Sequence, residues 1–313
     1  MPNFNFSWAP KVWSRAPGIP VWTEYFATAV PNPVVPSDDI RTCTTSEPMI
    51  FGATFDDGPS PFTPQLIDYF KNKSMLTTFY TVGSVAIQYP QIMLDTIHTW
   101  SHPKLTEVKS DDEIIAEFVY SAKAIHQVIG QAPRYIRPPY GQSNDRIRRL
   151  AATMGFQVVS YLDSQDWLHY NDQAKMEPLV LGHFRKWIEE KRMGIITLQH
   201  DVWQAEVTVA KKAMDLVVSA GYKITPIYKC LEESTPYGNQ ILEEFFASGQ
   251  FETHAKLITP RKEIASTTKT LTTTTTTTPL SATPLTGVVV KKVSSNQRVT
   301  VFWSLLFLGL MIV

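Results

Sequence analysis

Strand-like and helix-like stretches alternate along the middle of this chain, and this alternation constrains its fold more than any other feature. Short runs rich in β-branched and aromatic residues predict strands, and longer runs with one apolar face predict helices. We expect strands at 50–55, 77–82, 134–137, 156–161, 194–199 and 222–227, with helices from 63, from 110 to 130, and near 144–154, 174–192 and 205–220. This order predicts an α/β fold whose βα units close into a parallel barrel, with functional residues at the carboxyl ends of the strands.

Two of these helices carry signals at their ends. Thr63 is expected to cap the first of them, and the proline after it suits the first helical position. Ser110 is expected to open the second as part of a capping box with Glu113, and Gly130 to end it.

Two adjacent aspartates stand where the first predicted strand ends. Asp56 and Asp57 lie in the stretch TFDDGPS, directly before Gly58-Pro59. Neighbouring side chains of a strand point in opposite directions, so the two carboxylates can serve different purposes. An Asp-Asp-Gly triplet is more often a simple turn, and this motif alone does not establish a site.

A pair of histidines follows about forty residues later. His98 and His102 stand four residues apart in the stretch HTWSH, a spacing that lets two imidazoles bind one metal ion. Pairs of this kind are also common on protein surfaces without a metal. Together with one aspartate, the pair would leave coordination positions open for water.

Three further motifs follow predicted strands. They are RPPYG at 137–141, DSQDW at 163–167 and LQH at 198–200. Taken singly, each has an ordinary structural interpretation as a rigid turn, a loop with a buried indole, or a histidine packed in the core.

In this order, TFDDGPS, HTWSH, RPPYG, DSQDW and LQH resemble the five motifs of the polysaccharide deacetylase (NodB-like) family, carbohydrate esterases that remove acetyl groups from polysaccharides. The resemblance covers about residues 50–230. Within the family, the chain is most similar to fungal chitin deacetylases, because a Thr/Ser-rich stalk, here at 267–298, and an anchor-like tail, here at 299–313, occur in them as well. The resemblance implies a distorted, incomplete (β/α) barrel. It also implies hydrolysis of the N-acetyl groups of chitin to give chitosan and acetate, with peptidoglycan, xylan or another acetylated polysaccharide as the alternative substrate.

The resemblance assigns a metal site and a base. Asp57, His98 and His102 would bind Zn²⁺, with Co²⁺ or another divalent ion as the alternative. Asp56 would be the general base, and Arg137 would pair with it.

The resemblance also assigns the remaining motif residues. His200 would be the general acid, and Asp166 would orient it. The backbone N–H of Tyr140 would stabilise the tetrahedral oxyanion, and Tyr140 would also contact the substrate. Trp167 and Leu198 would form the apolar walls of the acetyl pocket.

One departure from the family pattern lies before the histidine pair. In the family, a helix and then a short strand with a Gly-His element precede this position, whereas residues 84–97 are long enough for the helix alone and contain no glycine. Either the strand is missing, which would leave a non-catalytic glycan-binding or wall-binding relative, or the helix is shortened to make room. His102 precedes Pro103, so a regular helix cannot set the geometry of the pair.

The ends of the chain differ in composition from its middle. We expect an irregular N-terminal segment at 1–45, the catalytic domain at 46–232 and a C-terminal extension at 233–266. A Thr/Ser/Pro-rich stalk follows at 267–298, and an apolar tail at 299–313. Fifteen residues are short for a membrane span, and the small residues and polar spacer upstream predict a GPI-anchor signal. The alternative is a soluble protein whose tail is a frayed helix.

These features predict a location at the extracellular face of the plasma membrane or in the cell wall, attached by a glycolipid anchor. No signal peptide is visible in residues 1–45, so either a leader precedes this sequence or export is atypical. Cys43 precedes the first predicted strand and Cys230 follows the last, and the two would form a disulfide in an oxidising compartment, or else remain two buried thiols. A net charge of zero indicates no nucleic-acid partner, and we expect a monomer whose partner is an acetylated polysaccharide.

Overall fold

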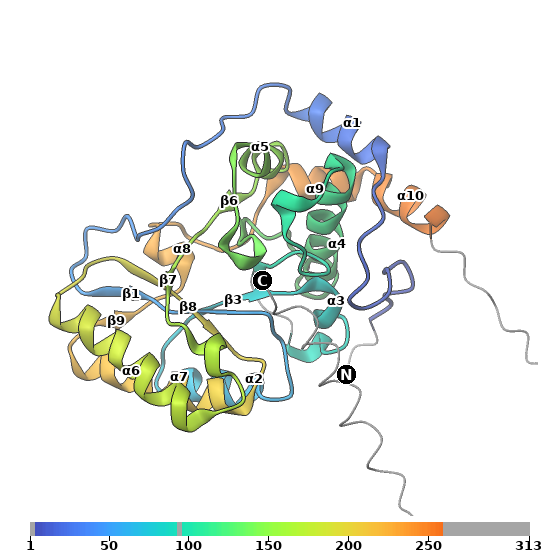
Figure 1. Cartoon of the computed structure of the whole chain (residues 1–313). Helices are drawn as coiled ribbons and strands as arrows, with labels where there is room; N and C mark the ends of the chain where they lie inside the picture. Colours follow the sequence, from blue (N-terminus) through green and yellow to red (C-terminus); the bar gives the residue numbers. More distant parts are fainter. Residues whose placement is uncertain (1–3, 93–95, 259–313) are drawn as a thin grey trace, which may run out of the picture. The chain divides into compact units, whose positions relative to one another are not determined.

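The computed structural model describes residues 4–92 and 96–258, and within them one sheet of parallel strands organises the fold (Figure 1). Its order is β6-β5-β4-β3-β2-β8-β1-β9, with β7 also paired to β8. The strands are β1 (Ile50–Gly52), β2 (Thr54–Asp56), β3 (Thr78–Thr81), β4 (Thr96–Ile97), β5 (Tyr135–Ile136), β6 (Gln157–Val158), β7 (Leu162–Asp163), β8 (Ile195–His200) and β9 (Lys223–Ile224). Among the described residues β6 and β9 are not paired with each other, so the sheet is open. The α/β class and the incomplete barrel are confirmed, and the closed barrel predicted from the alternation is wrong.

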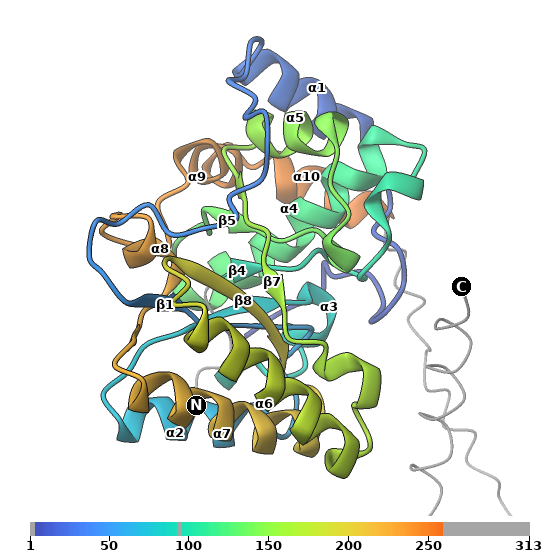
Figure 2. The same cartoon turned by 60° about the vertical axis from the view of Figure 1, so that its left-hand side comes forward.

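Helices cover both faces of the sheet (Figures 1 and 2). Helices α2 (Thr63–Asn72), α6 (Gln173–Glu189) and α7 (Gln204–Ser219) lie on one side; α1 (Pro20–Ala29), α4 (Asp111–Ile129), α5 (Asp145–Thr153), α9 (Gln240–Ala247) and α10 (Gln250–Ile258) lie on the other. Two helices are single turns, α3 (Gly83–Ala86) and α8 (Ile227–Cys230). Each layer of helices buries its own hydrophobic cluster.

The capping residues predicted from the sequence are found at the ends of α4 but not at the start of α2. The hydroxyl of Ser110 accepts the Glu113 N–H at the start of α4, and Gly130 ends that helix with a φ of 81°. Thr63, by contrast, is the first residue of α2 and not its cap, which is Phe62. The Thr63 hydroxyl instead accepts the backbone N–H of Ser60 at 2.7 Å, because the preceding loop folds back onto the helix.

The prediction that residues 1–45 are irregular is wrong for the helix α1. Pro20 starts this helix, and Trp22 and Phe26, four residues apart, form a buried stripe on one of its faces. The ring of Trp22 lies 5.3 Å from that of Tyr120 on α4 and 5.7 Å from that of Phe245 on α9. The segments on either side of the motif-bearing region therefore share one hydrophobic core with it.

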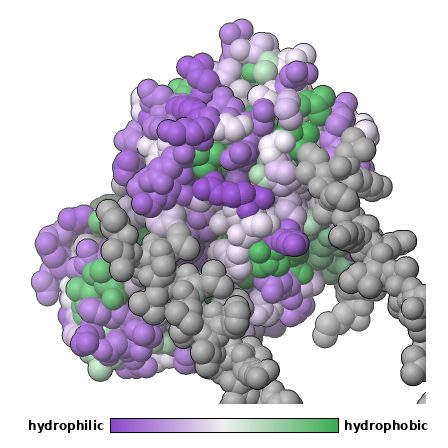
Figure 3. Space-filling model, turned by 45° about the vertical axis from the view of Figure 1, so that its right-hand side comes forward, coloured by the Kyte–Doolittle hydropathy of each residue, from purple (hydrophilic) through white to green (hydrophobic). Residues whose placement is uncertain are grey.

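The predicted stalk at 267–298 and tail at 299–313 lie outside the described residues. No helix of the described part combines the length and the hydrophobicity needed to cross a membrane. On the face drawn in Figure 3, hydrophobic side chains of the described residues form small groups separated by hydrophilic ones.

Cys43 and Cys230 form a disulfide that joins the segment before β1 to the last residue of α8. The backbone N–H groups of Thr44 and Thr45 both donate to the carbonyl oxygen of Cys230, at 3.0 and 3.2 Å. The bond thus closes a loop of 187 residues that contains all five motifs.

Removing this bond should destabilise the domain. A long closed loop restricts the unfolded chain strongly, so we expect the double variant Cys43→Ser/Cys230→Ser to lose about 2–5 kcal/mol in free energy of unfolding. Urea denaturation measures the loss, and a reducing agent should lower the stability of the wild type but not that of the variant. Equal stability of the two proteins under oxidising conditions would show that the bond does not form.

Candidate active site

Parallel pairing brings the motif residues to the carboxyl ends of the strands. In the register of the sheet, Asp56 at the end of β2 lies beside His200 at the end of β8. His98 and Arg137 directly follow the paired ends of β4 and β5. The five motifs, far apart in the sequence, therefore meet at one edge of the sheet.

Asp57, His98 and His102 converge on one point. The Asp57 Oδ1 atom lies 3.3 Å from Nε2 of His98 and 3.1 Å from Nε2 of His102. Three ligand atoms, one from each residue, lie within 4.8 Å of one another, and no other such group occurs among the described residues. Burial raises the pKa of Asp57, but His102 and His98 outweigh it and hold this pKa well below its usual value. The carboxylate is therefore ionised at neutral pH.

The chemistry of these donors fits a divalent metal ion. Nδ1 of His98 lies 2.7 Å from the carbonyl oxygen of Arg137 and must donate to it. In a neutral imidazole this leaves Nε2 as a lone pair that faces the carboxylate of Asp57. Asp57 Oδ1 is buried and has no hydrogen-bond donor. Two facing acceptors are unfavourable without a cation between them, and a metal-binding histidine typically donates its second ring nitrogen in this way.

The segment before His98 contains a short strand as well as a helix. Strand β4 directly precedes His98, and the preceding helix is reduced to the single turn of α3. The hypothesis of a missing strand is therefore wrong, and that of a shortened helix is confirmed. Thr99 and His102 have φ values of 65° and 57°, so the loop with the histidine pair is not helical, as expected from Pro103.

Asp56 has a different environment from Asp57. Arg137, which is wholly buried, donates from Nη1 to Asp56 Oδ1 at 2.7 Å and to the hydroxyl of Thr54 at 2.6 Å. Its other nitrogens donate to two backbone carbonyls at 3.2 Å, and its guanidinium carbon lies 4.0 Å from the centre of the Tyr80 ring. Asp56 Oδ2 lies 3.8 Å from Nε2 of His98. Asp56 is thus held beside the cluster but is not a member of it.

His200, which lies beside Asp56 in the register of the sheet, is held by Asp166. Asp166 accepts the backbone N–H of His200 at 2.7 Å with one oxygen and contacts Nδ1 at 2.8 Å with the other. Nε2 of His200 lies 3.8 Å from Asp57 Oδ2. Burial lowers the pKa of His200, but Asp166 outweighs it, so this pKa is well above its usual value. His200 is therefore suited to carry a proton at Nε2.

The three predicted substrate-contacting residues differ in exposure. Tyr140 has a φ of 60°, is 42% exposed, and its ring lies 4.7 Å from that of His102. Trp167 is 38% exposed and donates from Nε1 to Asp163 at 3.1 Å. Leu198 is buried on β8 and, two residues before His200, points to the same face of the strand. Two aromatic rings are thus open to solvent, and Leu198 lies beneath the surface.

Sequence reasoning missed two buried carboxylates beside the site. Asp201 follows the motif histidine directly; it accepts the hydroxyl of Thr63, and its carbonyl accepts the hydroxyl of Ser60 at 2.6 Å. Burial raises the pKa of Asp201 to about 7. Glu206 accepts two backbone N–H groups that precede α7. An acidic residue next to a motif histidine was the available signal for Asp201, and the capping position was the signal for Glu206.

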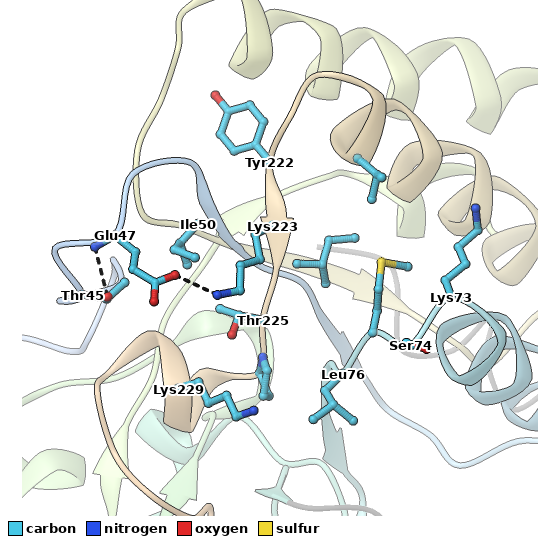
Figure 4. Close-up of a pocket in the computed structure, with 14 residues that line it drawn as sticks. Thr45, Glu47, Ile50, Lys73, Ser74, Leu76, Tyr222, Lys223, Thr225 and Lys229 are labelled. Atoms are coloured by element: carbon cyan, nitrogen blue, oxygen red, sulfur yellow. Dashed lines mark hydrogen bonds and ion pairs between the residues drawn. The ribbon is translucent and has the colours of Figure 1, made fainter.

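A cavity of about 430 Å³ lies at the opposite, amino-terminal ends of β1 and β9 (Figure 4). Lys223 at its wall is paired with Glu47 at 2.8 Å, and Lys73 with Asp215 at 2.9 Å. None of the motif residues lines this cavity, so it is separate from the candidate active site.

Known proteins match this chain over the region that carries the motifs. The family model described as polysaccharide deacetylase matches residues 44–159. Chitin deacetylase 1 of Cryptococcus neoformans var. grubii is 37% identical over 63% of this chain and 46% of its own length. Chitin deacetylase 1 of Saccharomyces cerevisiae is 35% identical over 58% of this chain and 60% of its own length, so the chain spans about half the length of these relatives. The solved chitin deacetylase from Colletotrichum lindemuthianum has a TM-score of 0.58 and 25% identity, covering 65% of this chain and 96% of that one.

Breaking the buried ion pair between Arg137 and Asp56 should lower the stability of the domain strongly. Arg137→Met keeps much of the side-chain volume but leaves Asp56 buried and unpaired, and we expect a loss of about 3–5 kcal/mol in free energy of unfolding. Arg192→Ala is the control, because its pair with Glu190 is exposed and should contribute about 0–1 kcal/mol. Urea denaturation compares the two variants, and similar small losses in both would contradict the importance of the buried pair.

Proposed function

We propose that this chain is a polysaccharide deacetylase, a zinc-dependent enzyme that hydrolyses the N-acetyl groups of chitin to give chitosan and acetate. The observation that carries the proposal is the convergence of Asp57, His98 and His102 on one point, beside an aspartate that is not part of the cluster. The named activity of the fungal relatives supports chitin as the substrate.

The two aspartates would divide the work between them. Asp57, His98 and His102 would hold the zinc ion. When bound, zinc supplies a Lewis acid and lowers the pKa of a water molecule at the site. Asp56 would take the proton from the attacking water, because Arg137 orients it through one oxygen and leaves the other oxygen free to accept.

His200 and the residues around it would complete the reaction. An amine is a poor leaving group until it is protonated, and His200, charged and oriented by Asp166, would donate the proton from Nε2. The backbone N–H of Tyr140 would stabilise the oxyanion of the tetrahedral intermediate. Trp167 and Leu198 would enclose the acetyl methyl group.

A non-catalytic binding role is the alternative, and the geometry disfavours it. That alternative rested on a missing strand before His98, and the strand is present. Another acetylated glycan remains an alternative substrate, since one solved neighbour at 25% identity is described as a peptidoglycan N-acetylglucosamine deacetylase. Hydrolysis rates on chitin and peptidoglycan fragments distinguish the two.

We also propose that the protein works as a monomer at the cell surface or in the wall. The disulfide between Cys43 and Cys230 supports an oxidising compartment. The Thr/Ser/Pro-rich stretch at 267–298 and the apolar tail at 299–313 support a stalk with a glycolipid anchor. Release of the protein from cells by a phospholipase that cleaves such anchors would test this location.

Metal content and acetate release test the site directly. We expect about one zinc per chain in the purified protein and acetate release from a soluble chitin oligomer. Asp57→Ala should lose both. Asp56→Asn should keep the zinc and lose about 10²–10⁴-fold in rate, because only the base is removed. Full zinc and full rate in Asp57→Ala would refute the metal assignment, and full rate in Asp56→Asn would refute the base.

Comparing an amide substrate with an activated ester tests the role of His200 as general acid. An activated acetate ester needs no protonation of its leaving group, so His200→Ala should slow amide hydrolysis about 10²–10⁴-fold and ester hydrolysis far less. His254→Ala is the control, since Nδ1 of this histidine lies 3.0 Å from the Gln250 carbonyl in its own helix, outside the motifs, and its loss should leave both rates unchanged. Equal losses on the two substrates would show that His200 is not the acid.

A further inference from the structure

The loop that carries both histidines is held by a helix outside the motifs. At the first turn of α3, the N–H of Gly83 donates to the Thr99 carbonyl at 2.9 Å, and that of Ser84 donates to the Trp100 carbonyl at 3.0 Å. Within the loop, the N–H of His102 donates to the Thr99 hydroxyl at 3.1 Å. The shortened helix therefore supports the segment between the two histidines.

A buried carboxylate on α4 holds the same loop from another side. Glu117 is wholly buried, and its Oε2 accepts the Ser101 N–H at 2.7 Å. Its Oε1 accepts the Ser101 hydroxyl at 2.7 Å and the N–H of Ala16 at 2.9 Å. Burial raises the pKa of Glu117, while these three donors favour the ionised form. Two of the three donors belong to Ser101, so this contact fixes both the backbone and the side chain of Ser101, the residue before His102.

The third donor, Ala16, belongs to the N-terminal segment, which lies outside the family match at 44–159. This segment makes three further contacts with the loop and with the helices that hold it. The Trp8 ring lies 6.2 Å from that of Trp100 and 6.0 Å from that of Tyr120 on α4. The N–H of Trp13 donates to the hydroxyl of Ser84 at 3.2 Å.

From these contacts we propose that Glu117 is a positioning residue of the metal site, and that residues 8–16 are part of the support of that site. The hydrogen bonds of Glu117 go to Ser101 and Ala16, so Glu117 acts on His102 through Ser101. His102 has a φ of 57°, which is unfavourable for a residue with a Cβ atom and persists only where the surroundings impose it. The inference rests on the proposed function, because it assumes that Asp57, His98 and His102 bind a metal.

The competing explanation is that Glu117 only stabilises the domain. A purely structural role predicts lower stability with unchanged metal affinity, whereas a positioning role predicts weaker metal binding in a protein that is still folded. Glu243 offers a matched comparison. It is a carboxylate on α9 that accepts the backbone N–H of Ala132 and lies 3.1 Å from Nε2 of His126, at the other end of α4.

The test compares Glu117→Gln and Glu243→Gln in the full chain. Competition with a chromophoric chelator gives the zinc affinity, thermal unfolding gives the stability, and the visible spectrum of the Co²⁺-loaded protein reports the coordination geometry. We expect both variants to lose stability. Only Glu117→Gln should bind zinc about 10–100-fold more weakly, with altered Co²⁺ bands, because removing outer support of metal ligands has effects of this size. Its acetate release should recover towards the wild-type rate at saturating zinc.

Unchanged zinc affinity and an unchanged Co²⁺ spectrum in folded Glu117→Gln would overturn the inference. If that variant does not fold, Ser101→Ala replaces it, since it removes one of the three donors and keeps the carboxylate. Weaker zinc binding in Ser101→Ala would support the inference, and unchanged binding would overturn it. A wild-type chain that binds zinc but releases no acetate would refute the proposed deacetylase while leaving the comparison of affinities valid.

Discussion

The buried guanidinium of Arg137 is the interaction on which the rest of the site depends. A charge without access to water must find all its partners in the protein, so its surroundings are tightly constrained. Its side chain donates to Asp56 and Thr54 on β2 and to the two carbonyls that follow β6. Its own carbonyl accepts from Nδ1 of His98 and so turns Nε2 towards Asp57. One residue therefore orients both the proposed base and a proposed metal ligand.

This arrangement gives the neighbouring carboxylates of Asp56 and Asp57 different environments. Asp56 faces the buried cation of Arg137, whereas Asp57, with a φ of 73°, turns out of the strand towards two imidazoles. Across the site, His200 is held by a third carboxylate with its Nε2 directed towards the cluster. A carboxylate that can take a proton and a histidine that can give one thus both lie next to the cluster, an arrangement suited to acid and base catalysis in a single hydrolysis.

The sequence predicted those parts of the structure that are encoded locally. Helix α4 has a side-chain cap, a long apolar stripe and a terminal glycine, and its observed bounds agree with these signals. Strand β4 has only two residues, and its place is set by pairing with β3 and β5, which no local pattern reveals. From the sequence, Glu117 would be expected to point to solvent from an otherwise apolar helix. Its burial could not be predicted, because its partners Ala16 and Ser101 lie in distant segments of the chain. The motifs predicted the candidate catalytic residues and their partners Arg137 and Asp166, but not Glu117, which holds the loop of the two histidines from outside the motifs.

The central claim is that Asp57, His98 and His102 together bind the metal, and X-ray absorption spectroscopy of the zinc-loaded full chain tests it most directly. The structure predicts a first coordination shell of nitrogen and oxygen atoms, with the multiple-scattering signature of two imidazoles and no sulfur. A shell without imidazole scattering, or one with a single imidazole, would contradict the account.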